Sequence, residues 1–147
     1  MSIEDDVALL ERVPTLRLLG TTALRMVAIG SEQRDFERGD TLFSAGDEAD
    51  AGFVVQRGAF RIEDGAGAET TAGPGALIGE LALIVAMQRP SSAIALEQSA
   101  VIRVSRSLFQ RVLESDPAAA RRLRDAFASR SSQLASDILI AGAKLST

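Results

Sequence analysis

The sequence predicts a mainly β fold with flanking helices, and three features of the chain support this prediction. Between Gln33 and Val104, apolar residues recur with the period of two that is typical of short, half-buried strands. Turn residues separate these strands at nearly regular intervals, which favours an antiparallel sandwich or roll. Outside this region the apolar residues are spaced as on helices. With 147 residues, 46% of them hydrophobic, the chain is long enough for one core but too short for two domains, so we expect residues 1–147 to form a single domain.

Two short helices are predicted for the N-terminal segment, residues 1–30. An aspartate near the start of the chain is placed to cap the first helix, and Pro14 is placed to end it. A threonine is placed to open the second helix, which Gly30 ends. The capping residues are Asp5 or Asp6 for the first helix and Thr21 or Thr22 for the second.

The strands are expected within residues 31–105. Glycine permits the positive backbone φ of tight turns, and aspartate hydrogen-bonds to its own backbone, so dipeptides that contain glycine mark the strand ends. These dipeptides are Gly39-Asp40, Gly46-Asp47, Arg57-Gly58 and Asp64-Gly65. The alternation places Phe60, Ile62, Val101 and Ile102 in the core.

Helical spacing returns in residues 106–147, with a break at Asp116-Pro117 and then a long helix to about Gly142. About 25 helical residues span roughly 38 Å, which exceeds the width of a small β-roll. Part of the apolar stripe on this helix therefore needs another partner, and we expect either a homodimer seam or a cap over a ligand. The stripe consists of Leu123, Phe127, Leu134, Ile138 and Ala141.

The composition excludes several classes of protein. Without cysteine or histidine the chain lacks thiolate nucleophiles, Cys/His zinc sites and the commonest general base, so we expect neither an enzyme nor a metal site. The net charge of −4 disfavours nucleic acid and anionic membranes as partners. No run of 18 apolar residues and no signal-peptide pattern are present, so we expect a cytoplasmic protein.

Residues 79–92 carry the pattern with the clearest chemistry. Gly79 opens a short helical turn, in which the backbone amides of Leu81 and Ala82 can converge on an anion. The planar guanidinium of Arg89 matches a phosphate, while the carboxylate of Glu80 can accept a hydrogen bond from a sugar hydroxyl. Together these residues predict a pocket for a ribose that carries a phosphate.

This arrangement resembles the phosphate-binding cassette of the cyclic nucleotide-binding domain family, which includes the regulatory subunits of cAMP-dependent kinase, the bacterial catabolite activator and cyclic nucleotide-gated channels. The separation between Glu80 and Arg89 is the one found in the kinase regulatory subunits. The resemblance covers about residues 31–115 and implies an antiparallel, jelly-roll-like β-roll. It also implies a cyclic nucleotide ligand, no cofactor, and ligand contacts from Gly79, Glu80, Leu81, Ala82, Arg89, Ser91 and Ser92.

Pro90 departs from the family pattern, because the family usually has a backbone N–H there that binds the phosphate, and proline has none. Ser91 is the predicted substitute, whereas Ser92 also fits a polar residue at the start of a strand. Pro90 stands where cGMP-selective members have threonine, so cAMP is the first choice of ligand and cGMP the second.

The resemblance predicts a sensor domain that passes ligand occupancy through its C-terminal helices to an unknown downstream protein. No catabolite-activator output domain is expected after residue 117, because too few helices remain. The alternative is a ligand-free β-roll that acts as an interaction module and dimerises through residues 118–142. A cupin-type enzyme is disfavoured because it needs metal-binding histidines.

Overall fold

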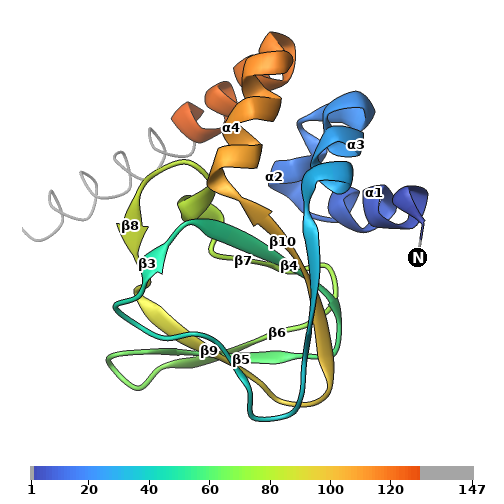
Figure 1. The fold of residues 1–147 in the computed structure, drawn as a ribbon. Helices are drawn as coiled ribbons and strands as arrows, with labels where there is room; N and C mark the ends of the chain where they lie inside the picture. The colour runs from blue at the N-terminus through green and yellow to red at the C-terminus, as the bar shows by residue number, and fades with distance from the viewer. Residues whose placement is uncertain (1, 130–147) are drawn as a thin grey trace, which may run out of the picture.

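The strands form two four-stranded antiparallel sheets that lie below a layer of helices (Figure 1). The computed structural model describes residues 2–129. The strand order is β1-β10-β4-β7 in the first sheet and β2-β9-β5-β6 in the second, and β3 pairs with β8 in a short ladder. In chain order the elements are α1 (Ile3–Glu11), α2 (Pro14–Arg17), α3 (Gly20–Gly30), β1 (Glu32–Phe36), β2 (Thr41–Phe43), β3 (Glu48–Ala49), β4 (Ala51–Arg57), β5 (Phe60–Asp64), β6 (Glu69–Ala72), β7 (Leu77–Ile78), the 3-10 helix η1 (Glu80–Leu83), β8 (Met87–Gln88), β9 (Ser91–Ala95), β10 (Ser99–Ser105) and α4 (Arg106–Ser115). The predicted antiparallel β-roll with flanking helices is confirmed.

The two central strands of the first sheet, β4 and β10, are buried on both faces, and strand alternation explains how. Val54 of β4 and Ile102 of β10 belong to the core cluster that contains the buried residues of the helices. Their neighbours Val55 and Val101 belong to a second cluster, which also includes Phe60 of the opposite sheet. Because successive side chains of a strand point to opposite faces, one sheet separates a helical core from the interior of the roll.

The N-terminal helices differ from the prediction at their ends. Ser2, not Asp5 or Asp6, caps α1, and Asp5 completes a capping box by accepting the backbone N–H of Ser2. Pro14 does not end this helix but opens α2, where its missing N–H costs no hydrogen bond.

The second predicted helix, α3, begins at Gly20 and follows Leu19, which provides no side-chain cap, so the prediction of Thr21 or Thr22 as cap was wrong. Its predicted end at Gly30 is confirmed. Burial of Leu24 and Val27 in the helical core stabilises α3 without a capping side chain from Leu19.

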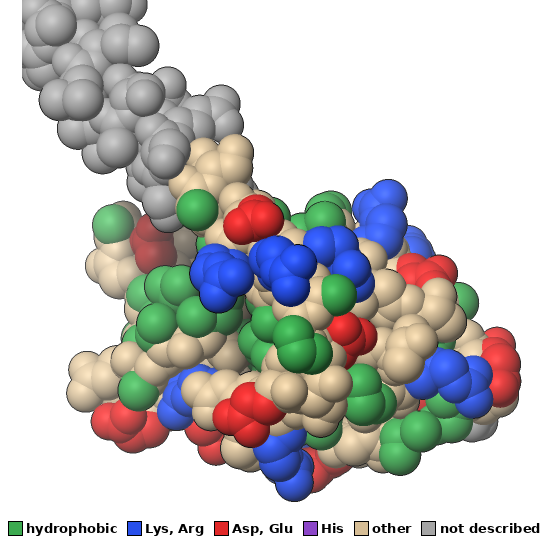
Figure 2. All heavy atoms as spheres, turned by 90° about the horizontal axis from the view of Figure 1, so that it is seen from above, with side chains coloured by type: hydrophobic (Ala, Val, Ile, Leu, Met, Phe, Trp, Pro, Cys, Tyr) green, Lys and Arg blue, Asp and Glu red, His purple; other side chains and the backbone are tan. Residues whose placement is uncertain are grey.

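The predicted break at Asp116-Pro117 is confirmed, because α4 ends at Ser115 and helix resumes over residues 117–129. The guanidinium of Arg122 donates to the backbone oxygens of Leu18 and Leu19, at 2.7 and 2.9 Å, and so ties this second helical stretch to the N-terminal helices. Figure 2, seen from the helical end, shows basic side chains gathered beside apolar ones on this face.

Three members of the predicted apolar stripe, Leu134, Ile138 and Ala141, lie outside the described residues, as does the predicted end of the helix at Gly142. Of the remaining two, Leu123 is buried and Phe127 half-buried. Within residues 2–129, no helix is long and apolar enough to cross a membrane. The single domain over residues 1–147 stays a prediction.

Candidate functional site

A cavity of about 240 Å³ lies between the two sheets where η1 and the segment before β9 meet. Six of the seven predicted site residues line it, and Ser92 is the exception. Strands β2, β5, β7 and β8 add apolar side chains, which leave few polar groups in its wall. The complete lining is Phe43, Ile62, Ile78, Gly79, Glu80, Leu81, Ala82, Met87, Arg89, Pro90 and Ser91.

Arg89 is the buried cation of this cavity, with only 6% of its surface exposed. Its Nη2 donates to the backbone oxygen of Ala51 at 2.8 Å. The guanidinium carbon lies 4.3 Å from the ring centroid of Phe43 and 5.3 Å from that of Phe53. Cation–π attraction over two rings holds the planar group in one orientation, and no carboxylate forms a salt bridge with it within the described chain.

The guanidinium has unused capacity for an anion. Its Nε is buried, and among residues 2–129 it has no hydrogen-bond partner. Burial lowers the pKa of Arg89, while Asp50 raises it, Arg103 lowers it and Asp47 raises it by smaller amounts. A buried cation with an unsatisfied donor is costly, and a bound anion would relieve that cost.

The backbone around Arg89 is held by the turn at Gly46-Asp47. The N–H of Arg89 donates to the oxygen of Asp47 at 2.7 Å, and the oxygen of Arg89 accepts from Gly46 at 2.8 Å. This turn follows β2 and precedes β3, whose ladder with β8 ends one residue before Arg89. The turn dipeptide found in the sequence therefore positions the candidate binding residue.

Gly79 is required at its position for two physical reasons. Its φ of 79° and ψ of 39° lie in the left-handed region, which L-residues with a side chain rarely adopt. A Cβ at this position would also lie 2.5 Å from Nη1 of Arg89, closer than two such atoms can approach. The glycine thus makes room for the arginine, a contact that sequence reasoning did not anticipate.

Glu80 begins η1 and is held from the helical layer. The hydroxyl of Thr15 in α2 donates to Oε1 of Glu80 at 3.1 Å.

The backbone N–H of Ala82 donates to the oxygen of Gly79 at 3.2 Å, within the 3-10 turn itself. An anion contact through this predicted amide would therefore replace a hydrogen bond that the turn already makes. The side chain of Leu81 is 51% exposed, so it is a surface group beside the cavity.

The two serines after Pro90 have different surroundings. Ser91 lines the cavity at the start of β9. Oγ of Ser92 accepts a hydrogen bond from the backbone N–H of Ala45 at 2.8 Å, which fixes the loop after β2. The strand alternation that sends Ser91 inward sends Ser92 toward this loop.

Sequence reasoning missed four groups of the site. Two are the rings of Phe43 and Phe53, which pack on the guanidinium, and one is the backbone oxygen of Ala51. The fourth is Thr15, which lies 65 residues before Glu80 in the chain. Aromatic residues in strands were a usable signal, whereas nothing in the residue types identified a backbone oxygen or a helical threonine as partners.

Known proteins share both the sequence pattern and the fold. The family model of the cyclic nucleotide-binding domain matches residues 33–116. A cAMP-dependent protein kinase regulatory subunit of Yarrowia lipolytica is 28% identical over 110 residues, which make up 74% of this chain and 29% of that protein. The chain thus spans less than a third of the length of this curated relative.

Two solved structures extend the comparison. A cyclic nucleotide-binding-like protein from Brucella abortus is 35% identical, with a TM-score of 0.66 over 75% of this chain and 98% of that chain. The N-terminal domain of a transcriptional regulator from Streptomyces coelicolor is 27% identical, with a TM-score of 0.80 over 88% and 94% of the two chains. Since the family model matches more than half of the residues and the roll has the same architecture, the chain belongs to the cyclic nucleotide-binding domain family.

Proposed function

We propose that the protein is a regulatory domain whose cavity binds the ribose and cyclic phosphate of cAMP. The observation that carries this proposal is Arg89, a buried guanidinium at the wall of a 240 Å³ cavity, whose Nε has no hydrogen-bond partner among the described residues. Family membership supports a cyclic nucleotide ligand and a regulatory rather than catalytic role. The residues provide binding and orientation, and no covalent step is involved.

In this proposal three residues of the cavity wall contact different parts of the ligand. The phosphate lies against Arg89, and hydrogen bonds to this charged group contribute about 1.5–3 kcal/mol each. Glu80 accepts a hydrogen bond from the ribose 2′-hydroxyl. Ser91 replaces the backbone donor that Pro90 lacks, and its position on the cavity wall supports this role.

The path from the ligand to the C-terminal helices runs through Arg106, the first residue of α4. Its Nη1 lies 3.2 Å from the backbone oxygen of Ala82 and 3.0 Å from that of Val85, both in the cassette. The same nitrogen lies 2.9 Å from the oxygen of Ala49. A ligand that shifts the cassette would move α4 with it, and the break at Pro117 provides the hinge between two populated states.

cAMP remains the first choice of ligand over cGMP, because Pro90 offers guanine no hydroxyl. A cytoplasmic location and a separate downstream protein also belong to the proposal.

A homodimer through the C-terminal helix is a further part of the proposal. A hollow of about 390 Å³ beside the cassette is mostly apolar, which supports a partner on this face. It is lined by Leu81, Ile84, Leu113, Ala120, Leu123, Arg124, Phe127 and Ala128.

The melting temperature with and without nucleotide tests the proposed function. A ligand at 100 times its dissociation constant stabilises a protein by about 2.7 kcal/mol, which for a chain of this size raises the melting temperature by roughly 5–10 °C. Millimolar cAMP should produce this shift and linear 5′-AMP should not. No shift with either cAMP or cGMP would instead support the alternative, a ligand-free interaction module.

A further inference from the structure

Thr15 connects the helical layer to the cavity, although it lies outside the residues that the family model matches. Its side chain is nearly buried, with 8% of the residue exposed, and its hydroxyl donates to Oε1 of Glu80 at 3.1 Å. A buried hydroxyl is retained at low cost only when it has a hydrogen-bond partner. This hydrogen bond therefore fixes the orientation of the Glu80 carboxylate, which binds the ribose hydroxyl in the proposed function.

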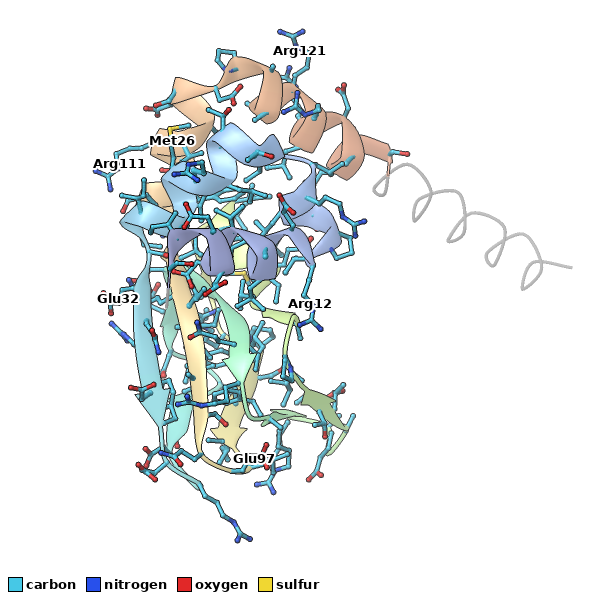
Figure 3. The ribbon with its side chains drawn as sticks, turned by 90° about the vertical axis from the view of Figure 1, so that its right-hand side faces the viewer. Arg12, Met26, Glu32, Glu97, Arg111 and Arg121 are labelled. Atoms are coloured by element: carbon cyan, nitrogen blue, oxygen red, sulfur yellow. The ribbon has the colours of Figure 1, made fainter. Side chains whose placement is uncertain are left out.

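The short helix α2 presents Thr15 from a well-fixed position. Val13 and Leu16, on either side of it in the chain, are almost completely buried in the helical core. Before α2, Arg12 donates to the backbone oxygen of Pro74 at 3.3 Å, and Figure 3 shows Arg12 where the helices meet the roll. Beyond α2, Arg122 binds the oxygens of Leu18 and Leu19. Because α2 is held on both sides, the Thr15 hydroxyl is a fixed donor.

We propose that Thr15 is a positioning residue for ribose recognition, acting through Glu80. A carboxylate can accept about four hydrogen bonds, so acceptance from Thr15 does not exclude a ribose hydroxyl. The inference rests on the proposed function and adds a residue from the N-terminal helices to the ribose subsite. Since binding couplings are reciprocal, occupancy of this subsite also stabilises the contact between α2 and the cassette.

The test compares three variants by titration calorimetry with cAMP and 2′-deoxy-cAMP. Thr15→Val removes the hydroxyl at nearly constant volume, Thr15→Ser retains it, and Thr22→Val changes an exposed threonine of α3 as a control. We expect Thr15→Val to weaken cAMP binding about three- to tenfold, the value of one net hydrogen bond, and to leave 2′-deoxy-cAMP binding unchanged. Thr15→Ser and Thr22→Val should bind both ligands like the parent.

The other outcomes separate this inference from the proposed function. A parent that binds cAMP while Thr15→Val binds it equally well, or loses both ligands to the same degree, overturns the positioning role alone. A parent that binds neither cAMP nor cGMP overturns the function and this inference with it. Should circular dichroism show that Thr15→Val is unfolded, Thr15→Ala removes the same hydroxyl and is measured with the same two ligands.

Discussion

Replacing Gly79 with alanine should lower both the stability of the fold and the affinity for the ligand. The size of the stability loss follows from the geometry. The backbone φ of 79° costs an L-residue about 1–2 kcal/mol. The new Cβ would lie 2.5 Å from Nη1 of Arg89, so the guanidinium must move. Moving it breaks the bond to the Ala51 oxygen, a charge-assisted bond of about 1.5–3 kcal/mol. We therefore expect a stability loss of about 2.5–5 kcal/mol.

Gly67→Ala is the matched control for this variant. Gly67 has a φ of 87°, but a Cβ there would meet nothing within 4 Å. Gly67→Ala should therefore lose only the stability that the left-handed backbone costs, about 1–2 kcal/mol. Urea unfolding measures both stabilities, and titration with cAMP measures both affinities. Gly79→Ala should bind at least about tenfold more weakly than Gly67→Ala, and equal losses in both assays would refute the steric role assigned to Gly79.

Five further substitutions test other parts of the proposal. Arg89→Lys should bind cAMP more tightly than Arg89→Ala but more weakly than the parent, since an ammonium lacks the planar fork of a guanidinium. Parental affinity in calorimetry would contradict this. Glu80→Gln should weaken cAMP binding by at most about 1.5–3 kcal/mol and 2′-deoxy-cAMP binding much less; equal losses would show a purely structural role. Ser92→Ala should lower the free energy of unfolding in urea by about 0.5–1.5 kcal/mol with little change in affinity for cAMP. Ser91→Ala should instead lower the affinity for cAMP. The reverse pattern would exchange the roles of the two serines. Phe127→Glu should turn a dimer into a monomer in sedimentation, and a parent that is monomeric with and without cAMP would exclude the dimer.

The longer helices and strands could be predicted because short-range signals determine them, whereas α2 and the short strands β3, β6, β7 and β8 were not predicted. Alternating apolar residues mark the strands around Phe60 and Val101, and the glycine-containing dipeptides mark the turns. The helix starts were predicted less well, since burial of α3 in the helical core makes a capping side chain unnecessary there. Local capping rules then identify the wrong residues, as at Thr21 and Thr22.

The candidate site could be predicted as a set of residues but not as an arrangement. The spacing from Gly79 to Ser91 brings together residues that line one cavity, and the residue types indicate an anion and a sugar. The contacts that orient them come from distant parts of the chain, such as Thr15 on Glu80 and the two phenylalanines on Arg89. Such contacts depend on tertiary packing, which a local pattern does not encode.

The affinity of the parent and of Arg89→Ala for cAMP, compared by titration calorimetry, tests the proposed function most directly. Arg38→Ala, at an exposed arginine of the loop after β1, is the matched control for the loss of one positive charge. We predict that the parent and Arg38→Ala bind cAMP alike. Arg89→Ala should lose about 3–5 kcal/mol, or two to three decades of affinity or more, because the buried phosphate would have no cation. Binding by Arg89→Ala within about threefold of the parent, a smaller loss than that of one hydrogen bond to a charged group, would contradict the assignment of this arginine to the phosphate.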